Sequence, residues 1–78
     1  MYSGQTIKVL RLLKGYSQQG IAKELGISQP AYSKLEKRKM VNKESSRKIL
    51  AIINCSPDEI RSVQQFIADP IVSDHRTS

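Results

Sequence analysis

Residues 18–35 have the sequence QQGIAKELGISQPAYSKL, and this stretch decides the fold. In its first half Ile21 and Leu25 lie four residues apart, which predicts an amphipathic helix over about 18–25. Gly26 then ends that helix, because glycine readily takes the left-handed conformation in which many helices stop.

The second half of the stretch predicts another short helix. Ser28 is a typical N-cap, and Pro30 suits the first turn, where the N–H that proline lacks has no helical partner. Tyr32 and Leu35 lie three residues apart and form the inner face of a helix that runs to about Glu36. Two short helices joined by a tight turn make a helix-turn-helix arrangement.

The two faces of this second helix differ in character. We expect Ala22 to let the two helix axes approach, and Ile27, in the turn, to point inward and join the apolar residues of both helices. The side chains left on the outer face are polar or small: Gln29, Pro30, Ala31, Ser33 and Lys34. A helix with such a face can enter the major groove of DNA with its N-terminus leading.

Two further helices are expected on either side of this pair. Ile7 and Leu10 have helical spacing within a helix over about 4–14, which Lys14-Gly15 ends. Asn42 is a plausible N-cap for a helix over about 43–53, whose apolar side is Ile49, Leu50, Ile52 and Ile53.

The clearest helix start is the segment Ser56-Pro57-Asp58-Glu59, which combines an N-cap, a proline at the first position and a capping box. The fifth helix is expected to run to about Ala68 and to end before Pro70. No segment alternates as a strand does. We therefore predict a compact all-α domain of five helices over residues 1–68, with a helix-turn-helix core at 18–36 and a frayed tail at 69–78.

Charge and length point to a small binding module with an anionic partner. The chain has 78 residues and a net charge of +6, which suits one small core and no large enclosed cleft. Residues 1–50 carry a net charge of +8, whereas residues 51–78 carry −2. The N-terminal part of the chain is therefore the part suited to a negatively charged partner.

Several functional classes lack the residues that they need. Cys55 is the only cysteine and His75 the only histidine, so neither a zinc site nor a nucleophile–histidine pair can be assembled. The four glycines form no phosphate-binding loop, and no apolar run is long enough for a membrane span. We expect no enzyme, cofactor, metal or small-molecule substrate, and a cytoplasmic protein that folds without disulfides.

The order of these segments resembles the Cro/repressor-type (XRE) helix-turn-helix domains of bacterial and phage regulators, over roughly residues 4–67. The segments that carry the resemblance are Ile7 to Arg11, Lys14 to Gln18, the core described above, Tyr32 to Glu36 and Ile49 to Ile60. Arg38 departs from it, since the family usually has glycine there, and so does Gly20, which weakens its helix by up to about 1 kcal/mol. The resemblance implies a five-helix lambda-repressor-like fold and a regulator that binds double-stranded DNA.

Gln29 is the strongest candidate for reading a base. Its amide can bond the N6 and N7 atoms of adenine together, and the matching position in the family commonly contacts a base. The alternative is that Gln29 caps its helix or bonds Gln18. Pro30 and Ala31 offer apolar contact to a thymine methyl group, or Pro30 simply starts the helix. Ser33 and Lys34 face the same side one turn further on and complete the predicted base-contacting set. Lys34 either reads guanine O6 and N7 or only neutralises a phosphate, and contact of some kind is favoured over specificity.

Backbone phosphates are expected to be met by polar groups at helix N-termini and by the basic stretch after residue 36. The alternatives are plain capping for the former and a solvated charged surface for the latter. The predicted phosphate contacts are Ser17, Gln18, Ser28, Lys37, Arg38, Lys39, Asn42 and Lys43.

The resemblance also implies two structural features. Arg11 and Glu36 hold the positions of an ion pair that fixes the recognition helix without touching DNA. Val63, Phe66 and Ile67 are candidates for a dimer interface, because family members often dimerise through C-terminal helices. The alternative is that the fifth helix folds back over Leu13 and Ile52 within one chain.

The functional prediction is a sequence-specific regulator with helix 28–37 in the major groove, acting as a homodimer on a palindromic operator with half-sites about 34 Å apart. A protein-interaction module of the same fold, such as an antitoxin or adaptor that works through the C-terminal apolar helix, is the alternative. An RNA-binding role has little support, because one Phe, three Tyr and no Trp leave few rings for base stacking.

Overall fold

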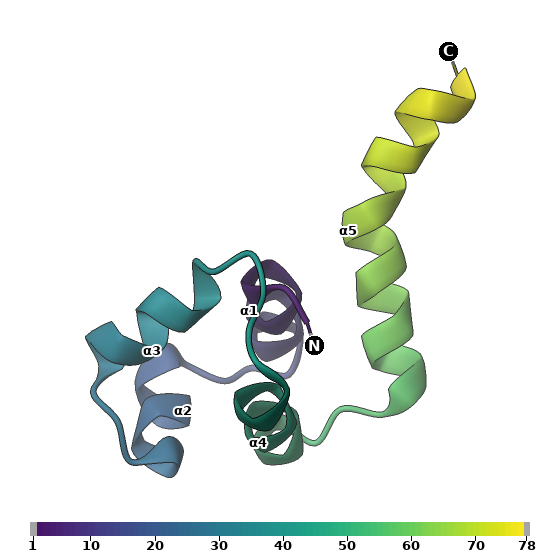
Figure 1. Ribbon diagram of the computed structural model, residues 1–78. Coiled ribbons are helices and arrows are strands. Elements are labelled where there is room, and N and C mark those ends of the chain that lie inside the picture. Colours follow the sequence, from purple (N-terminus) through teal and green to yellow (C-terminus); the bar gives the residue numbers. More distant parts are fainter. Residues whose placement is uncertain (1, 78) are drawn as a thin grey trace.

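The computed structural model describes residues 2–77, with side chains described over residues 2–67. Five helices follow one another: α1 (Gly4–Leu13), α2 (Gln18–Leu25), α3 (Gln29–Glu36), α4 (Lys43–Ile53) and α5 (Pro57–Thr77) (Figure 1). Over the described residues the only β pairing is an isolated bridge between Tyr2 and Val41. The predicted all-α fold of five helices is confirmed.

Side chains at the helix starts satisfy backbone N–H groups that have no partner within the helix. Ser17, Ser28 and Asn42 are the N-caps of α2, α3 and α4, as the sequence predicted. At the start of α5 the capping box is closed in both directions. Glu59 N–H donates to Ser56 Oγ at 3.1 Å, and Ser56 N–H donates to Glu59 Oε1 at 2.8 Å.

Helix ends explain how the chain turns between elements. Gly26 takes φ 74°, which lets the N–H of Ile27 donate to Ala22 O at 3.0 Å and close α2. Asn54 ends α4 in the same left-handed conformation, with φ 56°, which Asn tolerates better than most residues. Arg38 does not take a positive φ, so the connector after α3 turns without the glycine that is usual in the family.

The expected end of the fifth helix is wrong. Instead of ending near Ala68, α5 continues through Pro70 to Thr77. The fixed φ of proline lies in the helical range, so the chain can stay helical at the cost of one backbone hydrogen bond and some crowding. The predicted fraying of residues 69–78 stays a prediction, since the side chains there lie outside those described.

The core draws on all five helices and on the connector between α3 and α4. α1 packs against α3, α4 and α5, and α2 packs against α3 and α4. Ile27 differs from the expectation, because it is 38% exposed and lies at the edge of the turn. The buried apolar residues are Ile7, Leu10, Ile21, Ala22, Tyr32, Val41, Ile49, Leu50, Ile53 and Val63.

Two other observations bear on the kind of protein. None of the described helices is long and apolar enough to cross a membrane. Among the described side chains, no group of three or more His, Cys, Asp or Glu is placed to hold a metal ion.

Candidate nucleic-acid interface

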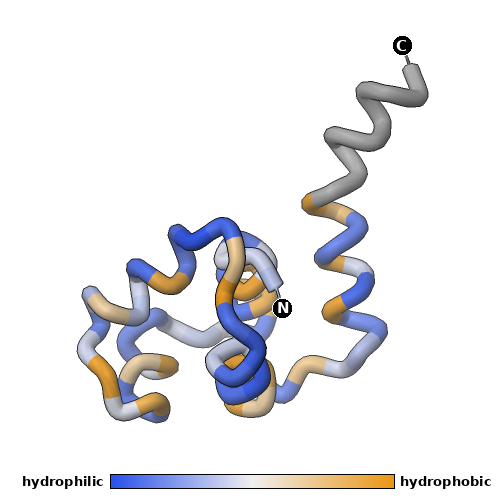
Figure 2. The backbone as a smooth tube through the Cα atoms, viewed as in Figure 1, coloured by the Kyte–Doolittle hydropathy of each residue, from blue (hydrophilic) through white to orange (hydrophobic). Residues whose placement is uncertain are grey.

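The outer face of α3 is open to solvent. Gln29, Pro30, Ala31 and Lys34 are exposed, and Ser33 is half-buried. The inner face of the same helix is anchored, because Tyr32 is fully buried and Glu36 is 6% exposed. Figure 2 shows hydrophilic residues along the end of α3 and the start of the connector that follows it. The structure therefore gathers the predicted base-contacting residues on one accessible surface.

The predicted phosphate contacts are exposed polar and basic groups at helix starts and after α3, except Gln18, which is half-buried. The caps use their acceptor oxygens locally: Ser17 Oγ accepts from Gly20 N at 2.9 Å, and Ser28 Oγ accepts from Ala31 N at 3.2 Å. Asn42 Oδ1 accepts from Ser45 N at 2.7 Å. Both serine hydroxyls keep a proton that a phosphate oxygen can accept.

The basic residues predicted to contact phosphate have solvent-exposed side chains. Within the described part of the chain none of these side chains pairs with a carboxylate. They are Lys37, Arg38, Lys39 and Lys43. Such groups are free to meet phosphate oxygens.

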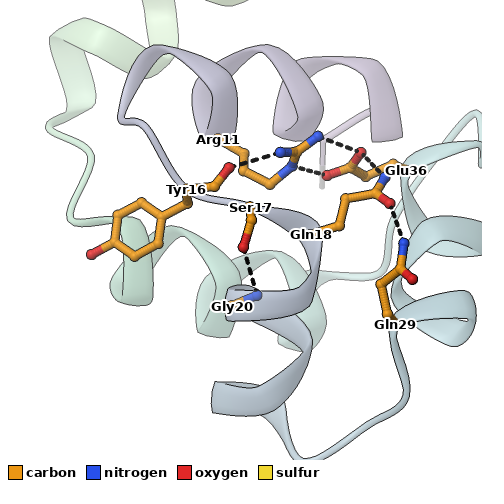
Figure 3. Close-up of polar contacts among 7 residues, drawn as sticks. All are labelled: Arg11, Tyr16, Ser17, Gln18, Gly20, Gln29 and Glu36. Atoms are coloured by element: carbon orange, nitrogen blue, oxygen red, sulfur yellow. Dashed lines mark hydrogen bonds and ion pairs between the residues drawn. The ribbon is translucent and has the colours of Figure 1, made fainter.

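Gln18 connects the outer face of α3 to its buried end. Gln29 Nε2 donates to Gln18 Oε1 at 2.9 Å, and Gln18 Nε2 donates to Glu36 Oε1 at 2.9 Å (Figure 3). The bond between the two glutamines is thus present in the free protein. It leaves the Gln29 amide with its oxygen and one N–H unused, and adenine N6 and N7 need one acceptor and one donor.

The hydrogen-bonded chain of amides ends at Glu36, which also forms an ion pair with Arg11, as Figure 3 shows. Arg11 Nε donates to Glu36 Oε2 at 2.6 Å and Nη2 donates to Oε1 at 3.3 Å. Arg11 Nη1 also donates to the Tyr16 carbonyl at 2.7 Å. The guanidinium therefore fixes the end of α3 to both α1 and the connector that leads into α2.

The environment of Glu36 determines its protonation. Burial raises the pKa of its carboxyl, but hydrogen bonds from Arg11 and Gln18 outweigh that effect and hold the pKa below the ordinary value. Glu36 is therefore ionised at neutral pH, and its charge is compensated within the fold.

Acid is expected to destabilise the protein through this group. Because the pKa of Glu36 is lower in the folded state, its contribution to stability is complete above the unfolded value of about 4.3. That contribution is lost as the pH falls through the folded pKa. Thermal unfolding can be followed by circular dichroism at a series of pH values from 7 to 2. The melting temperature should begin to fall once the pH is lowered below about 4.

Glu59 supplies the control for this experiment. A hydrogen bond from Lys14 lowers the pKa of Glu59 too, but its side chain is exposed. A Glu59→Gln variant should keep most of the acid-induced loss. A midpoint that is the same at pH 3 as at pH 7 in that variant would contradict the role given to Glu36.

Of the three residues predicted for an interface between subunits, only Phe66 has a largely exposed side chain. Val63 is 5% exposed and belongs to the core, and Ile67 is half-buried against it, so neither offers a large free surface. Phe66 is 71% exposed, and Leu12 and Leu13 on α1 are 57% and 71% exposed. α5 packs along α1, and an apolar groove between them is lined by Val9, Leu13, Ser62, Val63 and Phe66.

One group of residues that supports the connector after α3 has no clear signal in the sequence. Tyr2, Ser3 and Gly4 lie against the connector that follows α3, and their contacts are mostly made by backbone atoms. Val41 gives a hint, since it is an apolar residue in a largely polar, basic segment and is fully buried in the structure.

The family model described as “Helix-turn-helix” (HTH_3) matches residues 7–60, which is more than half of the chain. The match takes in α2, α3 and α4 complete, with most of α1 and the start of α5. Searches of curated proteins and of solved structures gave no significant match.

Proposed function

Since the chain belongs to the Cro/C1-type (XRE) helix-turn-helix family, whose domains bind DNA, we propose that it is a sequence-specific regulator of transcription. Families of this type are generally non-enzymatic. In this proposal α3 enters the major groove, and the protein acts on duplex DNA inside the cell, in the cytoplasm.

The main support for this proposal is the orientation of the exposed Gln29 amide, which Gln18 holds. Gln29 stands exposed in the first turn of α3, and its bond to Gln18 holds the amide before any DNA arrives. An amide that is already oriented loses less conformational entropy when it bonds adenine. Pro30, Ala31, Ser33 and Lys34 lie on the same helix and are proposed to meet neighbouring bases.

Affinity is proposed to come from the groups that surround α3. Ser17, Ser28 and Asn42 are exposed at the N-termini of α2, α3 and α4, where backbone N–H groups attract phosphate. The exposed cations follow the C-terminal end of α3 and continue to Lys43, the first residue of α4. Each phosphate neutralised should steepen the fall of log affinity with log salt by roughly one unit.

We propose that the protein binds as a homodimer on an inverted repeat with half-sites about 34 Å apart. Phe66 on α5 and Leu13 on α1 are the exposed apolar residues that a second copy would cover. The same exposed residues favour a second candidate function, in which this surface binds a different protein and the fold serves as an antitoxin or adaptor.

Replacing Gln29 with alanine is expected to cost about 1–3 kcal/mol on the cognate site and little on random DNA. The cognate site would come from selection out of a random duplex pool, and binding would be measured at one salt concentration. Gln64, an exposed glutamine on α5, provides a matched control, because Gln64→Ala should leave both affinities unchanged. Equal weakening on both duplexes would remove the specificity role of Gln29.

The selected sequences also separate the other proposals. An inverted repeat would support the homodimer, whereas a single half-site would contradict it. Binding without an enriched motif would contradict a sequence-specific regulator and favour the protein-interaction function.

A further inference from the structure

The first residues of the chain are joined to the connector between α3 and α4 by backbone hydrogen bonds. Gly4 N–H donates to the Arg38 carbonyl at 2.9 Å, and Val41 N–H donates to the Tyr2 carbonyl at 2.7 Å. Tyr2 and Val41 form an antiparallel bridge. We call residues 2–4 the N-terminal strap and residues 37–42 the basic connector. Figure 1 shows the N-terminal end of the chain beside that connector.

The approach is close because position 4 has no side chain. A Cβ atom there would lie 2.6 Å from the Leu35 carbonyl oxygen, on the last turn of α3. The positive N-terminal end of α1 thus meets the negative C-terminal end of α3, which stabilises the contact. Side chains of the strap also fix its own geometry, since Ser3 Oγ accepts from Thr6 N at 3.1 Å and caps α1.

The connector is anchored while its charges stay free. Val41 is fully buried, and its carbonyl accepts from Ser46 Oγ at 3.2 Å. Together with Arg38, which accepts from Gly4, this holds the connector backbone at two places. The side chains of Lys37, Arg38 and Lys39 remain exposed between and beside those places.

From this arrangement we infer that the N-terminal strap positions the basic connector for phosphate contact, so that affinity for DNA depends on the Tyr2 carbonyl although it touches no DNA. The inference rests on the proposed function. A connector that is ordered before binding loses less conformational entropy on the DNA backbone than a mobile one. The strap is therefore a positioning element, and the lysines and arginine make the contacts.

Two variants separate the strap backbone from the Tyr2 ring. Deleting residues 1–2 removes the carbonyl that Val41 bonds and leaves the Ser3 cap in place. Tyr2→Ala removes the half-buried ring but keeps the carbonyl. Fluorescence anisotropy on the selected duplex should show about tenfold weaker binding for the deletion and a salt slope smaller by about one unit. Tyr2→Ala should stay within about threefold of the intact chain.

A double-mutant cycle that combines the deletion with Lys39→Ala distinguishes positioning of the connector from a general loss of stability. In the intact chain this substitution should weaken binding several-fold, because it removes a phosphate contact. In the deletion background it should have little further effect, since the connector no longer holds Lys39 in place. Losses that simply multiply, or a folded deletion variant that binds like the intact chain, would overturn the inference.

If the deletion variant does not fold, two further measurements test the inference. The cycle would be repeated with two glycines inserted between Tyr2 and Ser3, which displaces the carbonyl and removes no side chain. Amide hydrogen exchange of the intact chain should show Val41 N–H protected like core amides, and exchange at the rate of an open loop would overturn the strap. An intact chain that binds no duplex would overturn the proposed function and the role of the strap with it. Intact binding that the deletion leaves unchanged would overturn the strap alone.

Discussion

Replacing Arg11 with methionine is expected to lower the free energy of unfolding by about 3–5 kcal/mol, because Glu36 would remain buried and charged without its partner. The two side chains are only 7% and 2% exposed, so water cannot take the place of the guanidinium. A domain of this size has about 5–15 kcal/mol of stability in all, so the loss would unfold much of the population on mild heating.

Urea denaturation at pH 7, followed by circular dichroism, would measure the change. Lys48→Met is the matched control, because Lys48 pairs with Glu44 at 3.5 Å and both side chains are largely exposed. That control should change stability by no more than about 0.5 kcal/mol. A loss below about 1 kcal/mol for Arg11→Met would contradict the buried ion pair.

Gly4→Ala is expected to destabilise the protein by about 3 kcal/mol, although alanine is the better helix former by about 1 kcal/mol. The added Cβ would lie 2.6 Å from the Leu35 carbonyl oxygen and 2.6 Å from the Glu36 carbonyl carbon. Both are backbone atoms of α3, which cannot rotate away as a side chain would. α1 and α3 would have to separate, and the Gly4–Arg38 and Tyr2–Val41 backbone bonds would be weakened.

Gly20→Ala provides the comparison for this substitution in the same denaturation experiment. A Cβ at position 20 would meet only Ser17 Oγ, at 3.1 Å, and that hydroxyl can shift by a few tenths of an ångström. Its stability should therefore stay within about 1 kcal/mol of the starting protein. If Gly4→Ala were equally mild, the close contact between α1 and α3 would be wrong.

Local signals in the sequence determined most of the helix boundaries. The caps at Ser17, Ser28 and Asn42 and the turn at Gly26 each act through hydrogen bonds within one helical turn, so the residues concerned lie close together in the sequence. The same locality explains the error at Pro70, since proline weakens a helix without always ending it. The exposed outer face of α3 also followed from periodicity alone.

Only the tertiary structure decided which groups meet across the fold. Gln18 bridges Gln29 and Glu36, Ile27 stays at the edge of the core, and the Tyr2 carbonyl bonds Val41. The hydrogen bonds of Gln18 and of the Tyr2 carbonyl join residues that are separated by 11 or more positions in the sequence. The strap contact in particular is made by backbone atoms, which every residue shares, so Gly4 and Val41 permit it but do not identify its partner. Its place is set by how closely α1 can approach α3, and that distance exists only once both helices are packed.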